Sequence, residues 1–333
     1  MNTATDTCLD PLTPLAACRL CPRACGVDRL AGQRGYCGAG VAPRVFRHGP
    51  HFGEEPPLSG TRGSGTVFFS HCTMRCIYCQ NYPWSQQAQG EDLELPQLTA
   101  LFRQLAVRGC HNWNLVSPTP WLPQIRAALA PLFKDGIRLP MVYNSSGFES
   151  PETLARFHDL ADIALVDLRY AANDTAAEAS GCPRYVESSR ATLAWFWENL
   201  GPLRLDADGI AVRGVICRVL VLPGHADEAV DNLRWLVSTV GADVHVSVMS
   251  QYTPVYGAQQ KTGWNRRVTA AEYGRVTAAV ENFGFARGWV QEFENGASPA
   301  ELLGCNMPAG EAAVSREPTD ATNGNDAADT RRT

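Results

Sequence analysis

A short apolar segment runs directly into three closely spaced cysteines, as Gly65-Thr-Val-Phe-Phe-Ser-His71 followed by Cys72-Thr-Met-Arg-Cys76-Ile-Tyr-Cys79. The apolar segment is typical of a buried strand, so the cysteines are expected on the loop that leaves it. Thiolates are soft ligands, and a C-x3-C-x2-C spacing can supply three irons of a 4Fe-4S cube. Because the stretch has no fourth cysteine, one iron can stay open for chemistry. The alternative, a structural zinc knuckle or incidental cysteines, is disfavoured by the same missing ligand.

The composition is typical of a globular enzyme. Of the 333 residues, 45% are hydrophobic and 19% charged, which is enough apolar material for a sizeable core. The net charge is −5 without a run of Lys or Arg, so nucleic-acid or membrane-surface binding is not expected. The polar start is not a signal peptide, and no apolar run reaches the length of a membrane span. Twelve cysteines therefore indicate a reducing cytoplasm and metal ligation rather than disulfides.

Strand and helix patterns alternate from Thr66 onward. Strands are expected at 65–71, 112–116, 140–143, 162–167, 215–221, 243–248 and 285–291. Helices are expected at 96–107, 151–160, 185–200, 227–240 and 268–283. Repeated strand–helix units predict an α/β fold with a parallel sheet, whose functional site lies at the carboxyl ends of the strands. The spacing allows a full or a partial barrel.

Three regions are expected along the chain. They are a small cysteine-rich, metal-braced N-terminal lobe at 1–60, a core at 61–305 and a disordered tail at 306–333 that lacks apolar periodicity. In the lobe, four thiolates are spaced as metal ligands, with glycines nearby for tight turns: Cys18, Cys21, Cys25 and Cys37. They predict a second metal site, either tetrahedral zinc or an auxiliary iron–sulfur cluster. The alternative is a set of unpaired cysteines.

The cysteine spacing, with the aromatic Tyr78 directly before the last cysteine, resembles the radical S-adenosylmethionine (SAM) superfamily. This resemblance implies a partial (β/α)6 TIM-like barrel and a 4Fe-4S cluster on Cys72, Cys76 and Cys79. It further implies that the open iron binds the amino and carboxylate groups of SAM. An electron from the cluster then cleaves SAM to a 5′-deoxyadenosyl radical, which abstracts hydrogen. Tyr78 is accordingly expected near the cofactor.

Further motifs resemble one branch of that superfamily, which is similar to pyruvate formate-lyase activating enzyme but carries an extra N-terminal cysteine lobe. The motifs are Cys18-x2-Cys21-Pro-Arg-x-Cys25, Gly35-Tyr-Cys37-Gly, Asn114-Leu-Val-Ser-Pro-Thr-Pro120 and Ser250-Gln-Tyr-Thr-Pro254. The resemblance implies a flavodoxin or ferredoxin as electron donor and a glycyl radical enzyme as partner. Modification of a small molecule or peptide stays open, as does a non-enzymatic iron–sulfur or zinc redox scaffold.

Two charged motifs at strand ends are candidates for contact with SAM. Asp167 and Arg169 resemble the Asp-Leu-Lys of activating enzymes, with Arg in place of Lys, and alternation puts both on one face of their strand. Arg218 lies in an apolar strand, where an arginine is costly unless it meets an anion, and the resemblance implies the SAM carboxylate. For both motifs the alternative is a structural ion pair.

Two polar turns complete the candidate site. Asn144-Ser145-Ser146-Gly147 corresponds in the resemblance to a stretch near the SAM ribose, and Asn144 and Ser145 are the expected contacts. Its alternative is a polar turn before the helix that Ser150 caps. Gln251-Tyr-Thr-Pro254 either faces substrate or forms an ordinary loop.

Overall fold

The computed structural model describes residues 10–293 of the chain. The expected tail at 306–333 and the last residues of the expected core lie outside the described residues. The strands are β1 (Arg44–His51), β2 (Ser64–Phe69), β3 (Glu91–Asp92), β4 (Trp113–Val116), β5 (Met141–Ser145), β6 (Ile163–Asp167), β7 (Arg204–Leu205), β8 (Ala211–Leu220), β9 (His245–Met249) and β10 (Gly288–Val290). The α-helices are α1 (Pro56–Ser59), α2 (Tyr82–Ser85), α3 (Leu95–Val107), α4 (Leu122–Lys134), α5 (Pro151–Arg156), α6 (Asn173–Ser180), α7 (Tyr185–Leu200), α8 (Ala226–Val240) and α9 (Ala270–Asn282).

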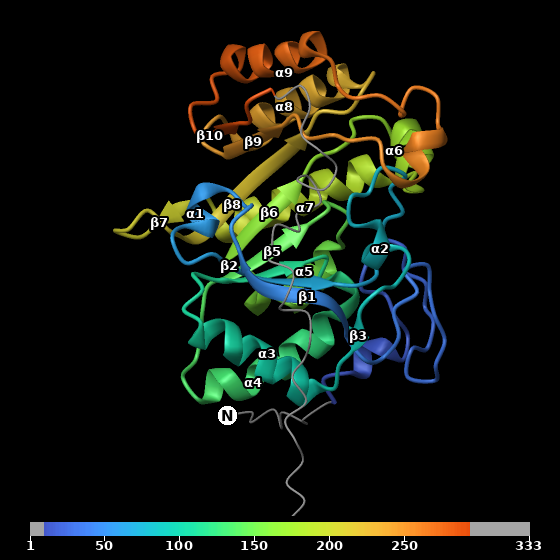
Figure 1. Ribbon diagram of the computed structural model, residues 1–333, viewed down its shortest axis with the longest axis vertical. Helices are drawn as coiled ribbons and strands as arrows, with labels where there is room; N and C mark the ends of the chain where they lie inside the picture. Colours follow the sequence, from blue (N-terminus) through green and yellow to red (C-terminus); the bar gives the residue numbers. More distant parts are fainter. Residues whose placement is uncertain (1–9, 294–333) are drawn as a thin grey trace, which may run out of the picture.

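These strands form one mixed sheet in the order β10-β9-β8-β6-β5-β4-β2-β1-β3, with β7 paired to β8. From β2 to β10 along the sheet every neighbouring pair is parallel, and these parallel strands lie side by side in their chain order. β1 pairs antiparallel with β2, and β3 pairs antiparallel with β1. In Figure 1, α3 and α4 cover one end of this sheet, and α8 and α9 cover the other. The fold is therefore a mixed α/β fold, as predicted.

The two faces of the central strands have different neighbours. Alternation places Val142, Leu165 and Ile216 on one face, where they form an apolar cluster with Leu58 of α1. The opposite face packs into the large core beneath the helices. Toward the carboxyl ends of the same strands, the face that α1 covers becomes polar, with Asn144 on β5 and Arg218 on β8. α1 thus closes the apolar half of this face and leaves the polar half for a cavity.

Local sequence signals set the starts of two helices, and the cap at Ser150 was expected. Ser150 caps α5 by accepting from the Thr153 amide, and Pro151 takes the first position of the helix. Thr269 and Glu272 form a capping box at the start of α9. Among the described residues, no helix combines the length and the apolar character needed to cross a bilayer.

The segment from Arg44 to Gly60 belongs to a different part of the fold than expected. The sequence assigns it to the N-terminal lobe, but it supplies β1 and α1, which belong to the sheet and to the cluster around Leu58. Two long or well-formed helices, α4 and α6, also have no counterpart among the expected elements. Pro123 and Pro131 interrupt the pattern of α4, and α6 contains few apolar residues.

Candidate active site

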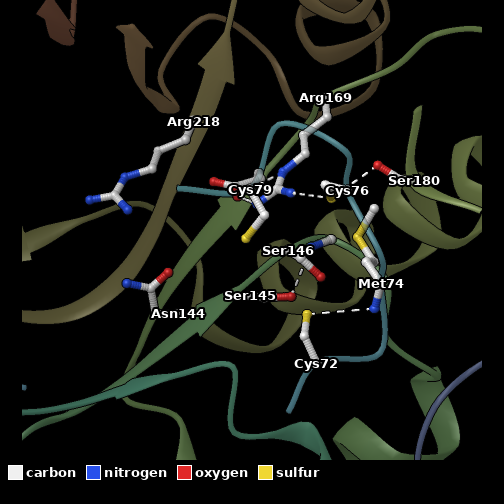
Figure 2. A network of polar contacts seen from close by, with 12 residues as sticks. Cys72, Met74, Cys76, Cys79, Asn144, Ser145, Ser146, Arg169, Ser180 and Arg218 are labelled. Carbon is white, nitrogen blue, oxygen red and sulfur yellow. Dashed lines mark hydrogen bonds and ion pairs between the residues drawn. The ribbon is translucent and has the colours of Figure 1, made fainter. Parts of the chain in front are cut away.

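A cavity of about 450 Å³ opens at the carboxyl ends of the parallel strands. Its wall contains all three cysteines of the C-x3-C-x2-C loop, which connects β2 to α2. The other candidate residues that line it are Tyr78, Asn144, Ser146, Asp167, Arg169 and Arg218. Together with the cysteines they come from four segments of the chain, so the fold brings together residues that lie far apart in the sequence. In Figure 2 the three sulfurs lie around one space, with Arg218 and Asn144 on its far side.

The cysteine loop is held by backbone hydrogen bonds to distant elements. The amides of Arg75 and Ile77 donate to the carbonyls of Ser180 (3.1 Å) and Ala179 (2.8 Å) at the end of α6. The Ile77 carbonyl in turn accepts from the amide of Ala258, at 2.9 Å. Anchoring on both sides fixes the loop without a metal, so it is preorganised for ligands.

Each cysteine sulfur has a hydroxyl group as a hydrogen-bonding neighbour. Ser180 Oγ donates to Cys76 Sγ at 2.9 Å, and Arg169 Nη1 donates to the same sulfur at 3.2 Å (Figure 2). Ser85 Oγ lies 3.3 Å from Cys79 Sγ. Such donors satisfy a thiolate that is bound to a metal.

Burial keeps the outer two thiols protonated in the metal-free protein. It raises the pKa of Cys72 to about 11, partly offset by hydrogen bonds from the Met74 amide and the Ser117 side chain. It raises the pKa of Cys79 to about 12. Metal binding would therefore have to displace protons, as is usual for thiolate ligands. Ser117 itself has a φ of 56°, a left-handed conformation that is strained for a serine and is often found at functional sites.

Asp167 and Arg169 form an ion pair within the cavity wall. Arg169 Nε and Nη2 donate to Asp167 Oδ2 at 3.1 and 2.5 Å. Both side chains are largely buried, and Arg169 also reaches Cys76 as described above. The ion pair expected as the alternative is therefore present, and it stands directly beside the cysteine loop.

Arg218 is engaged by two carboxylates that the sequence analysis did not identify. Its Nε and Nη2 donate to Glu55 at 2.7 and 2.6 Å, and Nη2 also donates to Glu54. The three side chains are 14%, 5% and 7% exposed. Burial would raise the pKa of Glu55, but the charge of Arg218 outweighs it and holds that pKa below its usual value. These contacts correspond to the structural ion pair rather than to an arginine available for the SAM carboxylate.

Glu54 could have been noticed as half of an adjacent acidic pair, but nothing local indicates its partner. Its Oε1 also accepts from Asn114 Nδ2 at 2.9 Å and, more weakly, from Asn144 Nδ2 at 3.5 Å. Asn144 therefore lies in the cavity wall, with its amide directed toward Glu54.

Ser145 lies on the other face of β5 and does not line the cavity. Its Oγ donates to Glu149 Oε1 at 2.8 Å, and Thr119 Oγ1 and Tyr143 Oη donate to Glu149 Oε2 at 2.7 and 3.2 Å. Burial raises the pKa of Glu149 to about 7. Because side chains alternate along a strand, Asn144 and Ser145 cannot both face the cavity. The expected cofactor contact of Ser145 disagrees with this placement.

Thr253, in the loop that follows β9, contributes a polar atom with no partner among the described residues. It is 5% exposed, lines the cavity, and its hydroxyl makes no hydrogen bond there. A buried hydroxyl without a partner is costly, so this one is suited to a bound molecule. Of the two interpretations of Gln251-Tyr-Thr-Pro254, the cavity position favours contact with a ligand.

Two arginines attach the N-terminal lobe to the core. Arg23 Nε donates to the Thr73 carbonyl at 2.6 Å, and its guanidinium lies 3.3 Å from the ring centroid of Tyr36. Arg29 is 1% exposed and donates to the Pro120 carbonyl at 2.7 Å. The lobe is thus fixed directly against the cysteine loop.

The four cysteines of the lobe are close enough to influence one another electrostatically: Cys25 and Cys37 act on Cys21, and Cys18 and Cys25 act on Cys37. Burial raises the pKa of Cys21 to about 12. Within residues 10–293, however, no three His, Cys, Asp or Glu side chains are arranged to hold a single metal ion. A cubane cluster differs from a single ion, since each thiolate binds its own iron and the sulfurs need not converge on one point. The donor set of the cavity loop, three thiolates with hydroxyl neighbours, fits such a cluster.

Comparison with known proteins gives no functional assignment. No protein-family model matches the chain. It is 26% identical over 274 residues to the uncharacterized protein MJ0674 of Methanocaldococcus jannaschii, an alignment that covers 80% of this chain and 75% of the relative. The crystal structure of Streptococcus suis SuiB superposes with a TM-score of 0.42 at 11% identity, covering 66% of this chain. That region is about half of SuiB (47%), and a likeness this weak assigns neither fold nor function.

Proposed function

We propose that this chain is a radical SAM enzyme that binds a 4Fe-4S cluster through Cys72, Cys76 and Cys79. The observation that carries the proposal is that all three cysteines line one cavity together with charged and amide side chains from the carboxyl ends of several parallel strands. The motif alone could occur on a loop that holds only a structural metal. Its position at the mouth of a parallel sheet is where α/β enzymes bind their ligands.

The cavity wall also offers suitable partners for SAM. When bound, the cluster and SAM would supply an electron and a 5′-deoxyadenosyl radical for hydrogen abstraction. Asp167 and Arg169 present opposite charges beside the cysteine loop, which suits the amino and carboxylate groups of SAM. The unpartnered hydroxyl of Thr253 would donate to or accept from a polar atom of the same ligand. The amide of Asn144 and the hydroxyl of Ser146 also line the cavity, and groups of this type can form hydrogen bonds with the ribose hydroxyls of SAM.

The sheet topology is compatible with the partial (β/α)6 barrel that radical SAM proteins have. Seven strands of the described chain are parallel and lie in the sheet in their chain order, which is also the strand arrangement of a (β/α) barrel. The antiparallel strand β1 extends the sheet beyond β2. We further propose that Cys18, Cys21, Cys25 and Cys37 hold an auxiliary iron–sulfur cluster. The alternative from the sequence, a zinc ion, is disfavoured because these side chains are not arranged around a single ion. The lobe's attachment to the cysteine loop through Arg23 supports a coupled role for the two sites.

The substrate is proposed by class alone. A glycyl radical enzyme or a small molecule or peptide would donate the hydrogen atom, and a flavodoxin or ferredoxin would supply the electron. The cavity wall contains three carboxylates, from Glu54, Glu55 and Asp167, but only two arginines among its described residues. This excess of negative charge would oppose a strongly anionic substrate.

The decisive experiment is anaerobic cluster reconstitution followed by reduction in the presence of SAM. The parent protein should bind iron and sulfide and release 5′-deoxyadenosine, measured by chromatography. Replacement of Cys72, Cys76 or Cys79 by Ala should abolish 5′-deoxyadenosine release and lower the bound iron and sulfide by the content of the cavity cluster. Cys110→Ala, which changes a buried cysteine outside the cavity wall, should leave both unchanged. A protein that binds the cluster but never cleaves SAM would instead be a non-enzymatic redox scaffold.

A further inference from the structure

Three buried hydroxyl groups form a hydrogen-bonded chain that ends on the sulfur of Cys76. Tyr78 Oη lies 2.5 Å from Tyr170 Oη, and Tyr170 Oη lies 2.5 Å from Ser180 Oγ. Ser180 Oγ then donates to Cys76 Sγ at 2.9 Å. The four side chains are 5%, 0%, 0% and 4% exposed in this order, so bulk water does not compete for the bonds. They come from the cysteine loop, the segment after β6 and the last residue of α6.

Binding of a metal at Cys76 would orient all the hydrogen bonds of this row of hydroxyl groups in one direction. A metal-bound thiolate has no proton and can only accept, so the Ser180 hydroxyl must donate to Cys76. Its oxygen is then left to accept from Tyr170, whose oxygen in turn accepts from Tyr78. Hydrogen bonds aligned in this way polarise one another, and the bond to the sulfur becomes stronger than an isolated serine would provide.

We infer that Ser180, supported by Tyr170 and Tyr78, raises the reduction potential of the cluster bound at Cys76. The inference rests on the proposed function. Hydrogen bonds to the sulfurs are among the features that set the potential of an iron–sulfur cluster. Reduction adds negative charge that spreads onto the ligating sulfurs, so a donor stabilises the reduced cluster more than the oxidised one.

Ser180 can be distinguished from the residues that would bind SAM. Arg169 also donates to Cys76 Sγ, at 3.2 Å, but it lines the cavity and pairs with Asp167. Ser180 and Tyr170 do not line the cavity within the described part of the chain. Substitution of Ser180 or Tyr170 should therefore change the reduction potential of the cluster without removing a contact to SAM. Ser180 is a positioning residue in this account because it acts through Cys76.

The test is a redox titration of the reconstituted protein, followed by the electron paramagnetic resonance signal of the reduced cluster. Ser180→Ala should shift the midpoint potential to more negative values. Tyr170→Phe keeps the serine but removes the donor to it, so its potential should shift in the same direction by less. Ser189→Ala is the matched control, since Ser189 is a buried serine (1% exposed) whose hydroxyl donates to the Val186 carbonyl.

The outcomes separate this inference from the proposed function. If all variants bind a cluster and its midpoint potential equals the parent's, the inference is overturned and the proposed function stays intact. A shift as large in Ser189→Ala as in Ser180→Ala would also overturn it, because the effect would then reflect general loosening. If Ser180→Ala fails to bind a cluster, the midpoint potential of Tyr170→Phe decides instead: a value more negative than the parent's supports the inference, and the parent's value overturns it. A parent protein that binds no cluster would overturn both proposals.

Discussion

Replacing Arg218 by Met should destabilise the fold much more than it weakens binding of SAM. The guanidinium is shared by Glu54 and Glu55, and its removal leaves two carboxylates without a counter-charge in a largely buried setting. Breaking a buried ion pair by deleting one partner costs about 3–5 kcal/mol, so we expect the free energy of unfolding at pH 7 to fall by about that amount. Met keeps most of the stem, so the cost reflects lost charge more than lost volume.

Urea unfolding, followed by far-ultraviolet circular dichroism, measures this loss. Arg213→Met is the matched control on the same strand, because the Arg213 guanidinium donates to the Asn199 carbonyl at an exposed site. Its effect should stay within about 1 kcal/mol. Adding Glu55→Gln to Arg218→Met should restore part of the stability, since one of the two uncompensated charges disappears.

The pH dependence supplies an internal check on the Arg218 prediction. In the parent protein, Arg218 holds the pKa of Glu55 below its usual 4.5, so the ion pair contributes fully above pH 4.5 and less as the pH falls through the lower folded value. In Arg218→Met, burial raises that pKa and is opposed only by the weaker hydrogen bonds from the backbone and Ser247, so acid relieves the uncompensated charge. The stability gap between the two proteins should therefore narrow as the pH falls from 7 toward 4.5. A parent-like stability combined with SAM affinity lowered more than tenfold would refute the reasoning.

Three further predictions concern other parts of the molecule. Burial raises the pKa of Glu149 from 4.5 to about 7, so the parent's free energy of unfolding should fall by about 3 kcal/mol as the pH rises across that window. In Glu149→Gln the free energy of unfolding, measured by urea titrations at a series of pH values, should vary less with pH. The same variation with pH as in the parent would show that Glu149 is not its cause. Thr253→Val should weaken SAM binding about 2- to 12-fold by calorimetry without loss of stability, because its hydroxyl has no partner within the described chain. Equal affinity would exclude Thr253 from the binding site. Cys21→Ala should lower total metal by elemental analysis while the cavity cluster's resonance signal persists; unchanged metal content would argue against a second site.

The elements with strong apolar patterns could be predicted from the sequence. β5, β6 and β8 lie close to their expected ranges because buried parallel strands are almost continuously apolar. α7 agrees at both ends, from Tyr185 to Leu200. α4 could not be predicted, because its stability comes from packing against α3 and not from local propensity, which Pro131 opposes.

The candidate site was predictable only to the level of individual strand ends. Asp167 and Arg169 were expected on one face, and their ion pair follows from that local alternation. The face of Ser145 could also have been inferred from alternation, once Asn144 was assigned to the cavity. The partners of Arg218 could not, because Glu54 and Glu55 precede it by more than 160 residues and adjoin it only after β1 and α1 have folded against the strands.

The sequence by itself determined the chemistry that the C-x3-C-x2-C loop can support and the strand from which that loop leaves. Both depend on short-range features: covalent spacing places the sulfurs, and apolar patterning forms β2. The tertiary structure alone decided what surrounds each sulfur and each charge. Ser180 reaches Cys76 across 104 residues of chain, because hydrogen bonds between α6 and the cysteine loop hold them together. Such pairings depend on strand register and helix packing, which arise from the sum of many long-range contacts and leave no local pattern in the sequence.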